Sequence, residues 1–204
     1  MKIEYFDESW FAELSRPGSG SSKFNNGQVT IVGGSSLFFG SPMLALKVAT
    51  RVVGMVYFSS YFEDKEAADL LKAGLQSFIW VPREDLSDYI RKSDAVLVGP
   101  GMMRSHANVH DGGVVDSVGD ETREITLRLF EEHKNTKFVV DAGSLQVVRP
   151  EELPKGCVIT PNAKEFTILF GEEPSGEKDE LIEQVRRKAE AFGIVILHKG
   201  VVPV

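Results

Sequence analysis

The sequence is poor in cysteine, and this scarcity excludes two kinds of site. Cys157 is the only cysteine, so the chain cannot form an internal disulfide. No cluster of cysteine and histidine has the spacing of a zinc site. Cys157 lies in the apolar run Cys157-Val158-Ile159, and we expect a buried, inert thiol rather than a nucleophile.

The chain also lacks long hydrophobic runs and an excess of basic residues. No apolar stretch approaches the length that crosses a bilayer, and the first residues, MKIEY, contain no apolar signal core. The formal net charge of −7 argues against a broad surface for nucleic acid or anionic membrane. We expect a cytoplasmic protein with no nucleic-acid or membrane partner; a homo-oligomer stays open.

What is present is the pattern of an α/β domain. Short apolar runs alternate with longer amphipathic stretches, which is typical of βαβ units. The predicted strands are Val29–Gly33, Val53–Phe58, Phe78–Val81, Ala95–Gly99, Lys137–Asp141, Val158–Thr160 and Ile194–His198. The predicted helices are Pro42–Arg51, Lys65–Ala73, Asp120–Lys134, Ala163–Phe170 and Glu177–Phe192. We predict one domain over residues 1–204, with three α/β/α layers and a mostly parallel central sheet.

Two segments lack periodicity. Arg16–Ser22 is rich in glycine and serine and is predicted to be a loop. Met102–Gly119 contains two histidines and a pair of glycines, and a loop of this length is more often functional or mobile than inert.

Five predicted strands are followed by loops whose residues suit a ligand, at the edge where parallel sheets bind ligands. Gly33–Pro42 opens a helix, whose N-terminus favours negative charge, although it is neither a Walker loop nor a dinucleotide-binding turn. Gly99-Pro100-Gly101 exposes bare backbone. Each of these two segments is equally consistent with a plain turn.

The remaining three loops carry charged side chains. Asp141 can bind Mg²⁺ or orient a ligand hydroxyl, but capping of the next helix by Asp141 or Ser144 is slightly favoured. Asn162 and Glu165 can face one pocket, or can form a capping box. Lys199, followed by Gly200, can meet a phosphate or be a solvated lysine.

Taken together, the five loops resemble the ATP- or ADP-dependent NAD(P)H-hydrate dehydratases, a carbohydrate-kinase-related branch of the ribokinase-like superfamily. That family shows G-G-S-x-x-Y-x-G-A-P, G-P-G, D-A-x-A-L, T-P-H-x-x-E-F and K-G-x-x-T in this order. This chain reads Gly33-Gly34-Ser35-x-x-Phe38-x-Gly40-Ser41-Pro42, Gly99-Pro100-Gly101, Asp141-Ala142-Gly143-Ser144-Leu145, Thr160-Pro161-Asn162-x-x-Glu165-Phe166 and Lys199-Gly200. The similarity runs from about Lys23 to the end of the chain.

The resemblance implies a reaction and a set of site residues. A nucleotide, ATP or ADP, transfers its terminal phosphoryl group to the hydroxyl of hydrated NADH or NADPH with the help of Mg²⁺, and phosphate then leaves. The residues implied are Ser35, Ser41, Gly101 and Asn162 for the substrate, Lys199 and Gly200 for the nucleotide, and Asp141 and Glu165 near the metal.

The chain departs from the family pattern at two kinds of place. Phe38, Ser41 and Asn162 stand where tyrosine, alanine and histidine are expected. The family continues with a G-x-G-D segment whose aspartate is the expected base, and residues 1–204 do not contain it. We therefore expect a fold that is incomplete at its C-terminus, with the catalytic residue unknown and lying beyond Val204.

Two other functions stay open. Asn162 and Glu165 also match the N-x-x-E element of ribokinase-like small-molecule kinases, which act on sugars or vitamin precursors. The absent G-x-G-D segment is consistent with a non-catalytic, nucleotide-binding remnant.

We predict that residues 1–204 alone do not dehydrate hydrated NADPH at a useful rate. Losing a general base costs about 10²–10⁴ in rate, and losing an oxyanion-type donor costs on the order of 10²–10³ more. Recovery of reduced-cofactor absorbance should be measured with ATP and with ADP, beside a version continued through any downstream coding frame. Comparable rates from the two proteins would mean that a residue present here, Asp141 first, acts as the base.

Overall fold

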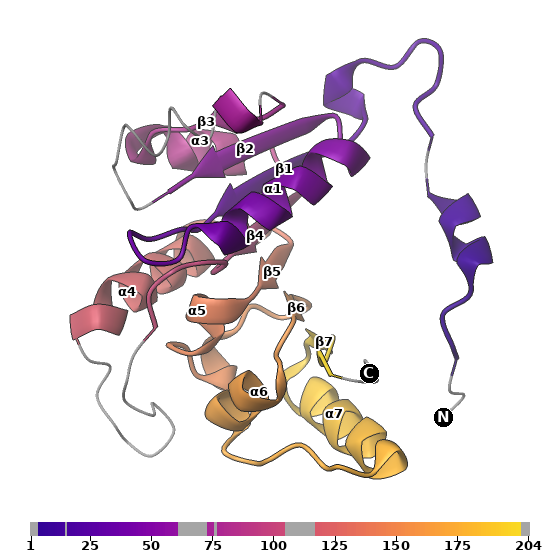
Figure 1. Cartoon of the computed structure of the whole chain (residues 1–204), viewed down its shortest axis with the longest axis vertical. Coiled ribbons are helices and arrows are strands. Elements are labelled where there is room, and N and C mark those ends of the chain that lie inside the picture. Colours follow the sequence, from indigo (N-terminus) through magenta and orange to yellow (C-terminus); the bar gives the residue numbers. More distant parts are fainter. Residues whose placement is uncertain (1–3, 15, 61–72, 76, 105–116, 201–204) are drawn as a thin grey trace.

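The computed structural model describes residues 4–14, 16–60, 73–75, 77–104 and 117–200. The strands are β1 (Gln28–Val32), β2 (Met55–Ser59), β3 (Ile79–Trp80), β4 (Ala95–Val98), β5 (Phe138–Val140), β6 (Val158–Ile159) and β7 (Val195–Ile196). They form one seven-stranded sheet in the order β3-β2-β1-β4-β5-β6-β7, and every pair is parallel (Figure 1). The predicted single, mostly parallel sheet is confirmed.

The helices connect these strands. They are α1 (Gly40–Val52), α3 (Leu86–Ile90), α4 (Ser117–Glu132), α5 (Ala142–Leu145), α6 (Ala163–Phe170) and α7 (Lys178–Phe192). Among the described residues, 3-10 helices also cover Glu8–Glu13, Lys23–Asn25, Arg83–Asp85 and Pro150–Glu152. None of the described helices is both long and apolar enough to span a bilayer. Helices α3 and α5 were not predicted because they are too short to show a helical period.

Some predicted boundaries need correction. The predicted loop Met102–Gly119 ends early, since its last three residues form the first turn of α4. Positions 105–116 of that loop, and all but the last residue of the predicted helix Lys65–Ala73, lie outside the described residues. The strand predicted from Val53 begins at Met55, because Val53 still donates its amide to Ala49 at the end of α1. The loop predicted at Arg16–Ser22 contains no helix or strand, as expected.

The two faces of the sheet are covered unequally. On one face the registered row Val32, Val98, Val140, Ile159 and Ile196 is entirely buried, beneath a core to which α4, α6 and α7 contribute. The other face of the sheet carries a second registered row of side chains. Helix α1 covers this row only at the end that contains Phe58 and Ile31. Along this second row exposure increases until Val195, on the edge strand β7, is 54% exposed.

The single cysteine lies in the larger core. Cys157 is 2% exposed, and burial raises the pKa of its thiol to about 12. At neutral pH the thiol is protonated, so the expectation of an inert cysteine is consistent with the structure.

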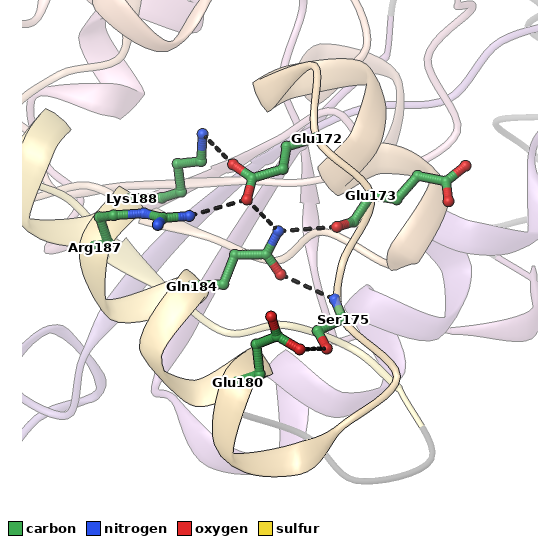
Figure 2. Close-up of polar contacts among 7 residues, drawn as sticks. All are labelled: Glu172, Glu173, Ser175, Glu180, Gln184, Arg187 and Lys188. Carbon is green, nitrogen blue, oxygen red and sulfur yellow. Dashed lines mark hydrogen bonds and ion pairs between the residues drawn. The ribbon is translucent and has the colours of Figure 1, made fainter.

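A buried glutamine fixes the loop between α6 and α7 (Figure 2). The amide nitrogen of Gln184 donates to Glu172 Oε1 at 2.8 Å and to the Glu173 carbonyl at 2.9 Å, while its oxygen accepts from the Ser175 amide at 2.9 Å. The carboxylate of Glu172 is also 2.8 Å from Lys188 Nζ. These contacts hold α7 against the loop that precedes it, and β7 follows α7 in the chain.

Stability should fall as the pH drops below neutrality, because two histidines are buried. His198 packs edge-on against Phe166, with ring centroids 5.6 Å apart, and His133 lies on α4's C-terminal side, 3.3 Å from Ser87 Oγ. Burial lowers the pKa of both rings below their ordinary value of 6.5. The unfolded chain then takes up protons near pH 6.5 that the folded chain does not, so the free energy of unfolding decreases as the pH falls through this region.

The substitution His198→Leu should therefore reduce the decrease in the free energy of unfolding that accompanies a fall in pH. Urea unfolding at about pH 7.5 and about pH 5.5 measures it, and the double variant with His133→Gln should show the flattest profile. If the pH profiles of the wild type and His198→Leu run parallel, the ring of His198 is not the source of the dependence.

Candidate functional site

The loops that follow the strands are tied together by backbone hydrogen bonds. The residue after each of β4, β5 and β6 donates its amide to the last residue of the neighbouring strand at 3.0–3.2 Å, and Lys199 donates to the Pro161 carbonyl at 2.8 Å. These donors are Gly99, Asp141 and Thr160. The sheet ladder thus continues into the loops, which fixes their order along the carboxyl edge.

Two glycines allow these loops to approach one another closely. Gly99 has φ +114°, and a Cβ there would lie 1.8 Å from the carbonyl oxygen of Asp141. Gly101 has φ +72°, and a Cβ there would lie 2.2 Å from the carbonyl oxygen of Phe38. Both features exclude any larger residue. The glycines of Gly99-Pro100-Gly101 therefore bring the loop after β4 against the loops after β1 and β5.

Three predicted site residues meet at this edge. The ammonium of Lys199 lies 2.6 Å from Asp141 Oδ1 and 3.8 Å from Glu165 Oε2. Thr160 Oγ1 donates a second hydrogen bond of 2.7 Å to Asp141 Oδ1. Glu165 is 5% exposed, whereas the side chain of Lys199 is 43% exposed. The arrangement is a solvent-accessible cation with two carboxylates behind it.

Of the two helix caps that the sequence suggested, the one at α6 is present and the one at α5 is not. Asn162 and Glu165 form a full capping box at the start of α6: Asn162 Oδ1 accepts from the Glu165 amide at 3.0 Å, and Glu165 Oε2 accepts from the Asn162 amide at 2.9 Å. Asp141 stands at the N-cap position of α5, but its side chain makes no capping hydrogen bond. The slight preference for Asp141 as a cap was wrong, because Thr160 and Lys199 take its carboxylate instead.

Two neighbouring cavities open beside this cluster. One, of about 180 Å³, is lined by Phe38, Ser41, Gly101, Met102, Arg104, Ala142, Gly143, Gln146 and Glu165. The other, of about 130 Å³, includes Ser35 and shares Met102 with the first. Glu165 belongs both to the first cavity and to the lysine cluster, so cavity and cluster are contiguous.

The predicted substrate residues are distributed unevenly over these cavities. Ser41 and Gly101 line the larger one, while Ser35 faces the smaller one and its hydroxyl accepts a hydrogen bond of 3.1 Å from the Phe38 amide. Asn162 and Lys199 line neither cavity, although a parallel bridge joins their backbones. Gly200 follows Lys199 as an exposed residue.

Three residues at the site were not singled out from the sequence. Thr160 holds Asp141, and its place within Thr160-Pro161-Asn162 was the available signal. Arg104 follows the glycine turn and places its guanidinium 5.9 Å from the ring centroid of Phe38. Gln146 lines the larger cavity from just beyond α5, a helix too short to be predicted.

The donors at the edge are suited to a hard cation. Among the described residues no group of three or more histidine, cysteine or acidic side chains is arranged so that it could hold a metal ion. Asp141 and Glu165 supply two carboxylates within 4 Å of one point, the Lys199 ammonium. Two carboxylates, completed by water and phosphate oxygens, are a usual way for proteins to hold Mg²⁺.

Comparison with solved structures shows which fold the chain has. A ribokinase-like superfamily protein from Enterococcus faecalis superposes with a TM-score of 0.75, at 18% identity, over 100% of this chain and 70% of its own. The ADP/ATP-dependent NAD(P)H-hydrate dehydratase of Bacillus subtilis, crystallised with ATP and Mg²⁺, superposes with a TM-score of 0.66, at 17% identity, over 92% of this chain and 63% of its own. The chain has the ribokinase-like α/β/α fold.

Sequence comparison gives the family within this class. The family model for NAD(P)H-hydrate dehydratase matches residues 29–204, and the chain belongs to that family. It is 33% identical over 199 residues to an ADP-dependent (S)-NAD(P)H-hydrate dehydratase of Nitrosopumilus maritimus, covering 89% of this chain. It is 32% identical to a bifunctional NAD(P)H-hydrate repair enzyme of Methanopyrus kandleri, covering 90% of this chain. The chain spans 62% of the length of the first relative and 34% of the second.

A methyl group at Gly101 should disrupt this edge. The substitution Gly101→Ala adds a left-handed backbone cost of about 1–2 kcal/mol and a clash with the Phe38 carbonyl that forces the loop to move. Gly156→Ala is the matched control, because Gly156 has φ +74° but no atom within 4 Å of its Cβ position. In urea unfolding, Gly101→Ala should lose more stability than Gly156→Ala; equal losses would show that the close approach is not rigid.

Proposed function

We propose that this chain carries the nucleotide and substrate sites of a nucleotide-dependent dehydratase. Such an enzyme converts hydrated NADH or NADPH back to NADH or NADPH. The observation that carries the proposal is the contact of Lys199 with Asp141 and Glu165 at the edge of the cavity that contains Gly101. A lysine at the mouth of a parallel sheet, with carboxylates behind it, suits a nucleotide that brings both phosphate and Mg²⁺.

In this proposal each residue has a limited task. Lys199 and the exposed backbone of Gly200 meet the terminal phosphates of ATP or ADP. Asp141 and Glu165 would hold Mg²⁺, and the ion would supply positive charge against the negative charge on the transferred group. Thr160 orients Asp141 by its 2.7 Å hydrogen bond.

The hydrated nicotinamide occupies the larger cavity. Ser41 and the bare backbone at Gly101 line this cavity. Ser35, in the neighbouring cavity, and Asn162, whose backbone pairs with that of Lys199, are the further substrate residues of the proposal. The ring hydroxyl attacks the terminal phosphorus, the bond from phosphorus to the nucleotide breaks, and the hydroxyl proton passes to a base. Phosphate then leaves from the ring carbon with the help of electrons from the ring nitrogen. We place the reaction in the cytoplasm.

The product decides between this reaction and that of a kinase. Hydrated NADPH with ATP or ADP should yield free phosphate and reduced cofactor, whereas a kinase would leave a stable phosphorylated product. The assay should include the chain continued through any downstream coding frame, since relatives are longer than this chain. A stable phosphorylated product from that longer protein would refute the proposal.

Nucleotide binding by this chain should depend on Lys199. Removing the ammonium in Lys199→Ala should weaken binding of ATP or ADP about tenfold to hundredfold, since a hydrogen bond to a charged group contributes about 1.5–3 kcal/mol. Lys164→Ala is the control, because Lys164 is an exposed lysine on the same edge, in the first turn of α6. Calorimetric titration with each nucleotide measures this, and equal affinities for the two variants would remove Lys199 from the nucleotide site.

A further inference from the structure

Helix α1 presents an apolar stripe to solvent. Leu44, Val48 and Val52 follow one another at four-residue spacing and are 64–70% exposed. Lys47 and Arg51 flank this stripe, and both are exposed. The helix contains no acidic residue, so its outer face is both apolar and basic. An amphipathic helix normally has polar residues on this face, and nothing in the fold described above covers it.

The N-terminal segment has the complementary character. Residues 4–14, which we call the arm, carry five large apolar side chains that are 44–71% exposed: Tyr5, Phe6, Trp10, Phe11 and Leu14. Phe6 packs edge-on against Trp10 and Phe11, with ring centroids 5.8 Å and 5.4 Å away, so the aromatic rings form one cluster. The arm also holds four acidic residues and no basic one.

The arm does not cover α1 of its own chain. Tyr5 lies against α7, where its hydroxyl is 3.3 Å from Lys178 Nζ and its ring centroid is 4.8 Å from the same atom. Figure 1 shows the arm extending beside the domain and well apart from α1. Within the part of the chain that the structure describes, the arm therefore does not cover the α1 stripe.

We propose that the arm of one chain docks on the α1 stripe of a second copy, and that the exchange is reciprocal. The acidic arm and the basic helix face are complementary in charge, which steers their association. Aromatic side chains bury about 150–250 Å² each when covered, so each arm contributes on the order of 500 Å² of its own surface. Two arms and two receiving helices then bury about 2,000 Å², which is sufficient for a stable dimer. The proposal does not depend on the proposed reaction.

Sedimentation of the full chain over a series of concentrations tests the dimer. We expect a species of twice the 22.5 kDa chain mass. Val48→Glu, and separately removal of residues 1–14, should raise the dimer dissociation constant by about thirtyfold or more, as for other central interface residues. A monomer at every concentration, or a dimer that survives removal of the arm, would overturn the proposal.

A charge exchange separates docking from damage to the fold. The variant Lys47→Glu/Arg51→Glu and the variant Glu8→Lys/Glu13→Lys should each be monomeric, and their mixture should form the dimer again. Val195→Glu is the matched control, because it places the same charge at a 54% exposed valine on the edge strand β7. If Val195→Glu dissociates the dimer and Val48→Glu does not, the interface lies at β7 and the proposal is wrong.

Discussion

The carboxyl edge of the sheet depends on backbone contacts that leave no room for side chains. Gly99 and Gly101 bring the loop after β4 within touching distance of the loops after β5 and β1, through the carbonyls of Asp141 and Phe38. A side chain at either glycine would separate these loops. The cavity beside Gly101 and the position of Asp141 both follow from this close approach.

Sequence patterns were sufficient for the sheet and for four of the helices. Alternation of apolar runs with amphipathic stretches reports burial directly, so the seven strands and helices α1, α4, α6 and α7 were placed within a few residues. Helices α3 and α5 could not be predicted, since four or five residues complete little more than one turn. The edge strands were predicted too long because an apolar run does not show where hydrogen bonding to a neighbour ends.

The site was predictable as a location but not as a set of contacts. The order of the loops indicated that Asp141, Glu165 and Lys199 lie at one edge, and their contacts agree with this. No pattern could show that Lys199 takes the carboxylate of Asp141 away from the helix that follows it, since that choice depends on residues 58 positions apart. The capping box of Asn162 and Glu165, by contrast, is local and was visible in the sequence.

The pairing of Lys199 with two carboxylates has a thermodynamic consequence. An anion that draws the ammonium away leaves Asp141 and Glu165 as two uncompensated negative charges, and a cation that engages these carboxylates releases the ammonium. Each ligand thus removes the internal partner that competes with the other. Linkage then requires that a phosphate and a divalent cation enhance each other's affinity by the same factor. An edge built in this way discriminates against either ion alone.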